Sequence, residues 1–353
     1  MTSPGPSPLN RLKTANAADE THASLLHGGD LAAARAQFPN APQPIVDLST
    51  GINPHPYPIA SLGEEDFARL PEPAALARLL DLAAAFYGAP SAQNVVAAPG
   101  SQILMALIAD LMPQGSAAIL GPTYAEHARV AALGGHAVAT VGSLADLGGA
   151  SLAVVVNPNN PDGRVTSKDD LSNLADEQKA NGGILVVDEA FMDVGPEGAS
   201  VSDQVEHAPI AVLRSFGKFF GLAGLRLSFA LVNRSLAERL RARLGPWPVS
   251  GPALSIGAAA LADRAWIDGT RMALRTASER LETLLSAAGL TPVGRTDLFC
   301  LVSSPRAQAV FTTLGEAGIF VRRFEENPQL LRFGLPGKEV EWQRLSGALK
   351  SPS

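Results

Sequence analysis

The chain has 353 residues, of which 46% are hydrophobic and 18% charged, and its formal net charge is −6. This composition excludes disorder over most of the length and leaves room for a large domain and a smaller one. Because no long run of Lys or Arg occurs, we expect no nucleic-acid or membrane partner and predict a small-molecule partner instead.

Cysteine content and the first residues bear on the compartment. Cys300 is the only cysteine, which excludes an intrachain disulfide and a cysteine-rich metal site, so we expect no metal and a cytoplasmic setting. Residues 1–20 lack a basic start followed by an apolar run, so we predict a flexible tail there and no signal peptide. Apolar runs such as Leu152–Val156 are far shorter than the roughly 20 residues that a membrane helix requires.

From about residue 74, short apolar runs alternate with segments of helical periodicity. This alternation is typical of a mainly parallel sheet covered by helices, so we predict an α/β fold with a seven-stranded sheet. The predicted strands are Val95–Ala98, Ala117–Leu120, Ala137–Val141, Leu152–Val156, Ile184–Val187, Ile210–Leu213 and Leu227–Val232. The predicted helices between them are Ile103–Met112, Ala125–Leu133 and Asp169–Ala180.

After Asn233 the pattern changes to Arg-rich and Ala-rich helices, which are interrupted at Gly245-Pro246-Trp247-Pro248. Because the prolines forbid a continuous helix, we place a domain boundary here. Residues 46–245 are predicted as a large domain and residues 246–353 as a smaller α+β domain. For the latter we expect helices at about 265–289, at 305–317 and after Lys338, and strands at 298–302, 319–323 and 330–334.

Lys218 follows an apolar strand in the segment Ser215-Phe-Gly-Lys-Phe-Phe-Gly221. Apolar surroundings disfavour the charged amine, as a nucleophilic lysine that forms a Schiff base requires. Taken alone, the segment fits equally well a lysine at a surface loop. Ser215 and Arg226 flank the lysine and can bind one phosphate together.

Three further motifs follow predicted strands. Gly100-Ser101-Gln102 opens a helix, whose N-terminal N–H groups can bind a phosphate, although such a start is often a plain cap. Asp188 ends a strand at the edge of the sheet where ligands of open α/β folds bind. Asn160 lies in the rigid turn Asn157-Pro-Asn-Asn-Pro-Asp-Gly163, and Tyr124 follows another strand. Each of these, taken singly, also fits a structural role.

In this order and spacing the motifs resemble the fold-type I enzymes that depend on pyridoxal phosphate (PLP), with the aspartate aminotransferase-like fold, in the class that includes histidinol-phosphate aminotransferase. The resemblance covers about residues 45–345. It implies that Lys218 forms the Schiff base with PLP, Asp188 pairs with the pyridine nitrogen, Asn160 bonds the phenolic oxygen and Tyr124 stacks on the ring. The implied phosphate ligands are Gly100, Ser101, Gln102, Ser215 and Arg226. Asp162 departs from the usual Thr, in the turn and not at a cofactor ligand.

The N-terminal segment is similar to a smaller family within this class of enzymes. His27-Gly28-Gly29-Asp30 and Asp47-Leu-Ser-Thr-Gly-Ile-Asn53 are similar to the threonine-phosphate decarboxylases of cobalamin biosynthesis, which usually carry Asn at the position of Asp30. This similarity implies that residues 21–45 form an arm over the active site and that His27, Gly28 and Asn53 contact the substrate. From the residues alone, an exposed loop histidine is the favoured interpretation of His27.

Two C-terminal arginines match anion-binding residues of the same family. The similarity implies that Arg332 binds the carboxylate or phosphate of a phosphorylated amino acid. It also implies that Arg322 makes a second contact with an anion of the substrate. Because side chains alternate along a strand, Arg322 and Arg323 point to opposite faces, and we favour Arg322 as the one that faces the cleft. Both arginines also fit surface ion pairs with Glu325 or Glu326.

Three functions are weighed on this basis. We predict PLP-dependent decarboxylation of L-threonine O-3-phosphate, with an aminotransferase of the histidinol-phosphate type as the alternative. A PLP-binding regulator is disfavoured, because the roughly 45 residues before the first motif are too few and too polar for a DNA-binding domain. The resemblance also implies a homodimer, in which Tyr57 serves the active site of the partner.

Overall fold

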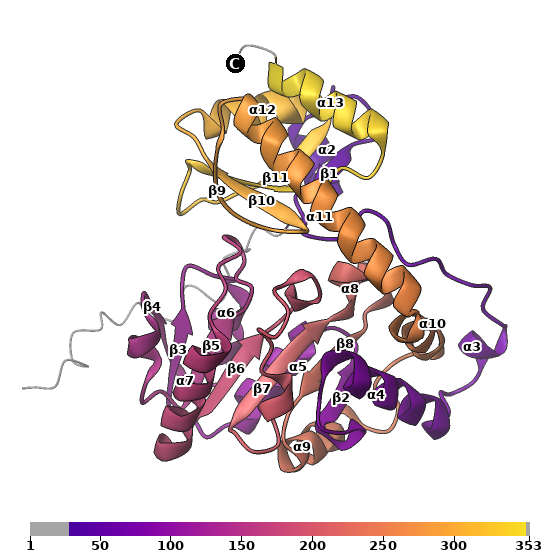
Figure 1. Ribbon diagram of the computed structural model, residues 1–353, viewed down its shortest axis with the longest axis vertical. Coiled ribbons are helices and arrows are strands. Elements are labelled where there is room, and N and C mark those ends of the chain that lie inside the picture. Colours follow the sequence, from indigo (N-terminus) through magenta and orange to yellow (C-terminus); the bar gives the residue numbers. More distant parts are fainter. Residues whose placement is uncertain (1–27, 351–353) are drawn as a thin grey trace, which may run out of the picture.

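The computed structural model describes residues 28–350. Two sheets stand one above the other, joined by a long helix (Figure 1). The strands are β1 (Val46–Leu48), β2 (Val95–Ala98), β3 (Ser116–Leu120), β4 (Ala137–Val141), β5 (Leu152–Val156), β6 (Ile184–Asp188), β7 (Ile210–Ser215), β8 (Ser228–Leu231), β9 (Thr291–Thr296), β10 (Phe299–Ser303), β11 (Ile319–Arg323) and β12 (Leu330–Gly334).

The α-helices begin with the N-terminal segment and end with the last turn that the structure describes. They are α2 (Leu31–Gln37), α3 (Glu65–Ala68), α4 (Pro73–Tyr87), α5 (Ser101–Leu111), α6 (Glu126–Leu133), α7 (Lys168–Asn181), α8 (Phe216–Phe219), α9 (Arg234–Leu244), α10 (Gly251–Ala262), α11 (Arg264–Ala287), α12 (Ala307–Glu316) and α13 (Glu339–Lys350).

The larger sheet has seven strands in the order β2-β8-β7-β6-β5-β3-β4, and only β8 runs antiparallel to its neighbours. Alternate strand residues pack against α5, α6 and α9 on one face and against α4, α7 and α10 on the other. Because both faces are buried, the strands appear in the sequence as continuous apolar runs, which is why they could be predicted. The predicted α/β fold with a mainly parallel seven-stranded sheet is confirmed.

The smaller sheet has the order β1-β11-β12-β10-β9 and packs against α11, α12 and α13. Its strand β1 comes from the N-terminal segment and lies parallel to β11. By contrast, α10 packs against α4 beside the larger sheet. These contacts differ from the predicted boundaries at residues 46 and 246, because they place β1 with the smaller sheet and α10 with the larger one.

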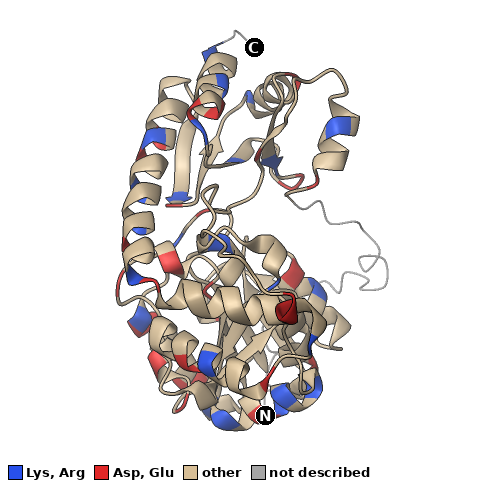
Figure 2. Cartoon of the chain, turned by 90° about the vertical axis from the view of Figure 1, so that its right-hand side faces the viewer, with Lys and Arg blue, Asp and Glu red and all other residues tan. Residues whose placement is uncertain are grey.

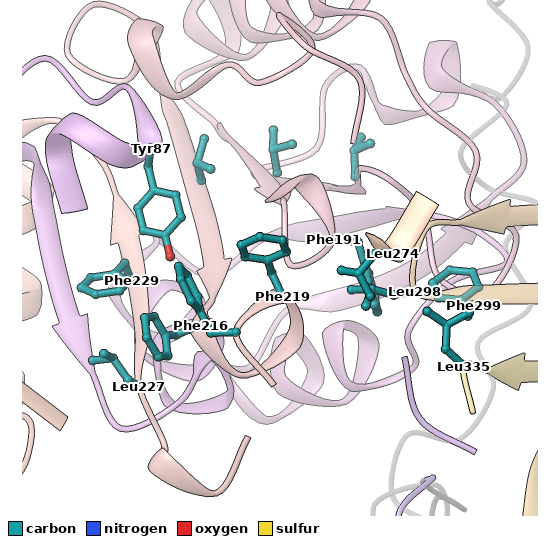
Figure 3. Packing of buried hydrophobic residues seen from close by; sticks show 14 of the residues in the cluster. Tyr87, Phe191, Phe216, Phe219, Leu227, Phe229, Leu274, Leu298, Phe299 and Leu335 are labelled. Atoms are coloured by element: carbon teal, nitrogen blue, oxygen red, sulfur yellow. The ribbon is translucent and has the colours of Figure 1, made fainter. Parts of the chain in front are cut away.

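One apolar core runs through both sheets. Figure 3 shows it passing from Tyr87 and Phe229 through Phe219 to Phe191 and Phe299. The rings of Phe191, after β6, and Phe299, on β10, lie 5.1 Å apart and almost perpendicular. The two sheets are therefore packed against each other at the end of the larger sheet where its parallel strands terminate.

Positions of Lys and Arg are interspersed with positions of Asp and Glu along the chain in Figure 2. Among residues 28–350, no helix has the length and apolar character needed to cross a membrane. No cluster of three His, Cys, Asp or Glu side chains suited to a metal ion occurs in the same part of the chain.

Candidate functional site

The predicted motifs meet at the carboxyl ends of the parallel strands. The register pairs Val156 with Asp188 and Asp188 with Leu213, so the segments that follow β5, β6 and β7 leave the sheet side by side. Ligands of open α/β sheets bind at this edge. The sequence therefore brings Asn160, Asp188 and Lys218 to one place through strand order alone.

Lys218 lies on the single turn of α8, directly after β7. The pKa of its amine is lowered to about 8, mainly by burial and also by the positive charges of Arg332 and Arg226, while Asp188 acts in the opposite direction. The amine nitrogen lies 5.8 Å from the centre of the Phe191 ring. A larger fraction of neutral amine at neutral pH is what a nucleophilic lysine needs.

Asn53, which was predicted to contact the substrate, instead supports the turn that carries Lys218. Its side-chain N–H donates to the carbonyl of Phe219 at 2.8 Å, and its backbone N–H donates to the carbonyl of Lys218 at 2.9 Å. Its side-chain oxygen accepts from the N–H of His55 at 2.8 Å. The sequence offered no sign of this, because the contact joins residues 166 positions apart.

Asp188 is buried and its carboxylate is held in place. One oxygen lies 2.8 Å from Nε2 of His127, on α6, and the other accepts from the N–H of Ala190 at 3.0 Å. The ring of Tyr124 stands perpendicular to that of His127, with centres 6.1 Å apart, and burial raises the pKa of Tyr124 to about 12. His127 was not predicted as a site residue, and only its position three residues after Tyr124 could have suggested it.

A cradle for an anion lies at the start of α5. Gly100 caps this helix with a φ of 103°, and a Cβ built on it would lie 2.3 Å from a terminal nitrogen of Arg226. The guanidinium of Arg226 therefore lies against the glycine, next to the N–H groups of Ser101 and the residues after it. A guanidinium and a helix N-terminus that converge on one point form a suitable site for a phosphate group.

The remaining predicted phosphate ligands occupy different surroundings. Ser215 is the last residue of β7 and pairs in register with Ser228. The side-chain amide of Gln102 donates to Glu126, a buried carboxylate that also binds Arg129 at 2.7 Å. The amide of Gln102 is thus turned toward Glu126, and a contact of Gln102 with a phosphate would use its backbone N–H.

Arg332 connects the two domains. One terminal nitrogen donates to the side-chain oxygen of Asn160, and the other donates to the carbonyl of Ser49 at 2.9 Å. Among residues 28–350 its buried Nε has no hydrogen-bond partner. Burial lowers the pKa of Arg332 to about 10, and the charge of Arg322 adds to that effect. A buried cation with a free donor is suited to an anionic ligand.

The strand register explains which arginine lies beside Arg332. Arg322 on β11 lies opposite Arg332 on β12, so both point to the same face of the sheet. Arg323 points the other way and packs over the ring of Phe311, with 4.9 Å between the guanidinium carbon and the ring centre. Arg322 also lies close enough to Tyr124 to interact with it electrostatically.

The N-terminal segment packs against Ser49. A Cβ on Gly28 would lie 2.3 Å from the carbonyl oxygen of Ser49, and the N–H of Gly29 donates to the Ser49 hydroxyl at 2.8 Å. The same residue accepts from Arg332. The carbonyl of Ser49 thus lies between Gly28 and Arg332. His27 lies outside the described residues.

Taken together, the residues fit PLP. The arrangement offers an amine with a lowered pKa, a buried carboxylate fixed by a histidine, an aromatic ring and an anion cradle. These are the groups that a pyridine aldehyde with a phosphate arm requires.

Comparison with known proteins agrees with this fit. A family model described as aminotransferase class I and II matches residues 43–349. Threonine-phosphate decarboxylase of Pseudomonas aeruginosa is 40% identical over 92% of this chain and 97% of its own length. Histidinol-phosphate aminotransferase 1 of Pasteurella multocida is 30% identical over 77% of this chain and 82% of its own length. The structure of histidinol-phosphate aminotransferase from Sinorhizobium meliloti in complex with PLP superposes with a TM-score of 0.79, at 21% identity, covering 92% of this chain and 94% of that chain.

Proposed function

Because the chain belongs to the aminotransferase class I and II family, we propose that it is a PLP-dependent lyase that decarboxylates L-threonine O-3-phosphate to aminopropanol phosphate. This reaction would serve cobalamin biosynthesis. The greater identity to a threonine-phosphate decarboxylase than to a histidinol-phosphate aminotransferase supports this choice over the predicted alternative.

The observation that carries the proposal is the pair of arginines above Lys218. Arg322 and Arg332 lie opposite each other in register on adjacent strands, and Arg226 lies separately at the anion cradle. Three guanidinium groups suffice for two phosphates, one on the cofactor and one on the substrate. If Arg322 and Arg332 hold the phosphate of the substrate, its carboxylate is left without a binding guanidinium and is free to leave.

Orientation then selects the bond that breaks. When bound, PLP would supply an electron sink for the bond to Cα that breaks. Arg322 and Arg332 would hold the phosphate of the substrate and leave its carboxylate free to depart as CO₂. Asp188, oriented by His127, would pair with the pyridine nitrogen of the cofactor and keep it protonated. The amine of Lys218 then delivers a proton to Cα, as general acid catalysis requires.

Product analysis tests the proposal. Purified protein with PLP and L-threonine O-3-phosphate is expected to release one CO₂ per aminopropanol phosphate formed, without a keto acid. Amino transfer to 2-oxoglutarate in place of CO₂ release would favour the aminotransferase alternative instead.

The assembly and compartment are proposed by family resemblance. We infer a homodimer in the cytoplasm. Within its own chain, the hydroxyl of Tyr57 donates to Asp263 at 3.3 Å and its ring packs on Trp266 with centres 5.1 Å apart. Analytical ultracentrifugation at working concentration is expected to give a dimer.

A further inference from the structure

A buried cluster of charges lies behind the site, on the segments that carry its main residues. The guanidinium of Arg214 lies 2.8 Å from a carboxylate oxygen of Glu189 and 3.1 Å from one of Asp193. All three side chains are at most 5% exposed. Glu189 also accepts from the hydroxyl of Ser200 at 2.7 Å and from the N–H of Val201 at 3.1 Å. Burial of such a cluster is costly, and the place of this one in the fold points to a role in positioning.

The positions of these residues in the sequence suggest that role. Glu189 and Asp193 enclose the segment that starts after Asp188 and contains Phe191, whose ring lies near the Lys218 amine. Arg214 lies on β7, four residues before Lys218. One guanidinium therefore ties the segment that carries the carboxylate to the strand that carries the amine. None of the three side chains takes part in the chemistry described above.

The cluster also reaches the helix that links the domains. Nε of Arg271, on α11, donates to the backbone carbonyl of Asp193 at 2.9 Å. The guanidinium of Arg271 lies 5.7 Å from the ring centre of Phe219, the neighbour of Lys218. The same helix continues into the smaller domain (Figure 1). The two segments at the site and the interdomain helix thus meet at one buried point.

We propose that Arg214 is a positioning residue that, through Glu189 and Asp193, fixes the Asp188 carboxylate relative to the Lys218 amine and so fixes the cofactor between them. The inference rests on PLP bound at Lys218, as in the proposed function, but it does not depend on the substrate. It goes beyond the resemblance, which assigns no role to these three residues.

The charges of the cluster make the proposal distinguishable from a purely structural role. Asp193 faces Arg214 from β7, Arg271 from α11, Glu189 from its own segment and Tyr87 from α4. Burial raises the pKa of Asp193 to about 6, against the opposing effect of Arg214, and burial raises the pKa of Glu189 as well. Tyr87 lies under the Arg214 guanidinium at 4.9 Å, and within residues 28–350 its hydroxyl has no hydrogen-bond partner.

The sign of the linkage follows from these shifts. A carboxyl whose pKa is higher in the folded state than in the unfolded state binds its proton more tightly when folded, so its protonation favours folding as the pH falls toward 6 and below. Protonation of Asp193 also removes the negative charge that pairs with one terminal nitrogen of Arg214. Neutral Asp193 is therefore expected to stabilise the fold while it loosens the cofactor, so stability and positioning move in opposite directions.

Three variants of the PLP-loaded protein test the inference: Arg214→Met, Asp193→Asn and, as a control, Leu314→Ala. Leu314 is fully buried on α12 in the smaller domain, so its truncation lowers the melting temperature without touching the cluster. The readouts are the visible circular dichroism of the cofactor band per bound PLP, the Kd for PLP and the melting temperature. The circular dichroism reports how rigidly the protein fixes the cofactor.

For Arg214→Met we expect a Kd for PLP at least about tenfold higher, from loss of a charged hydrogen bond, and a weaker dichroism per bound PLP. For Asp193→Asn we expect an unchanged or higher melting temperature and a weaker dichroism per bound PLP. In the wild type the dichroism should change between about pH 5 and 7 as Asp193 takes up its proton, and in Asp193→Asn this change should be lost. Leu314→Ala should melt earlier with unchanged dichroism. If Arg214→Met does not fold, Asp193→Asn alone decides.

Unchanged dichroism and Kd in the folded cluster variants would overturn the inference, as would a dichroism in Leu314→Ala that falls with its stability. A wild-type protein that binds no PLP would instead refute the proposed function, so the two failures are distinguishable.

Discussion

The substitution Arg332→Met is expected to impair turnover far more than folding. Arg332 has a free buried Nε, and its terminal nitrogens bind Asn160 and the carbonyl of Ser49. A bidentate contact of this guanidinium with the substrate contributes two charged hydrogen bonds of about 1.5–3 kcal/mol each. Their loss corresponds to roughly 10²–10⁴-fold in kcat/KM, at about 1.4 kcal/mol per factor of ten.

Stability is expected to respond differently. Because burial lowers the pKa of Arg332 to about 10, the fold already bears a cost for this cation, which methionine of similar length removes. Asn160 and Ser49 lose a donor at the same time, so we expect only a small net change in melting temperature. The assay is CO₂ release from L-threonine O-3-phosphate, with Arg323→Met as the matched control because Arg323 points to the opposite face. An Arg332→Met enzyme within about threefold of the wild type would refute the role of Arg332.

Three further predictions concern the cofactor site. Gly100→Ala should raise the Kd for PLP by about tenfold or more, since its Cβ would meet Arg226 and its φ of 103° disfavours a side chain. Gly88→Ala, at a φ of 75° in the left-handed region and with no atom within 4 Å, should leave the Kd unchanged; equal Kd values would contradict this. His127→Asn, which removes the partner of the buried carboxylate at the end of β6, should shift the cofactor absorbance and lower kcat about 10- to 100-fold; an unshifted spectrum would count against it. Burial lowers the pKa of Lys218 to about 8. The rate at which the apoenzyme binds PLP, measured by stopped flow, should therefore rise with pH up to about pH 8 and then level off. A pH midpoint of this rate near the pKa of an ordinary lysine would contradict the burial argument.

The larger sheet could be predicted almost completely, because strands buried on both faces keep an apolar signature that their neighbours do not alter. The smaller sheet was harder. Strand β9 contains Pro292 and Gly294, which argue against a strand except at an edge. The structure places β9 at the edge, where a Cβ on Gly294 would lie 1.9 Å from the carbonyl of Asp162. Strand β1 was missed because its three residues pair with a strand more than 270 positions away.

Some residues of the site could be predicted from the sequence and others could not. Lys218, Asp188 and Asn160 were predictable because each follows a strand, and strand order brings such positions together. His127 was not, because its contact with Asp188 depends on how α6, which follows a different strand, packs beside the end of β6. Asn53 was assigned to the substrate by resemblance, although its amide is bound to the backbone around Lys218. Contacts that depend on the packing of distant segments leave little trace in one sequence.

The most direct test of the central claim is the absorbance spectrum of the purified protein with PLP, beside Lys218→Ala, before and after addition of L-threonine O-3-phosphate with released CO₂ trapped. We predict a borohydride-sensitive band at about 410–430 nm that Lys218→Ala lacks, and CO₂ release by the wild type alone. A band that persists in Lys218→Ala, or turnover of the substrate without CO₂, would contradict this prediction.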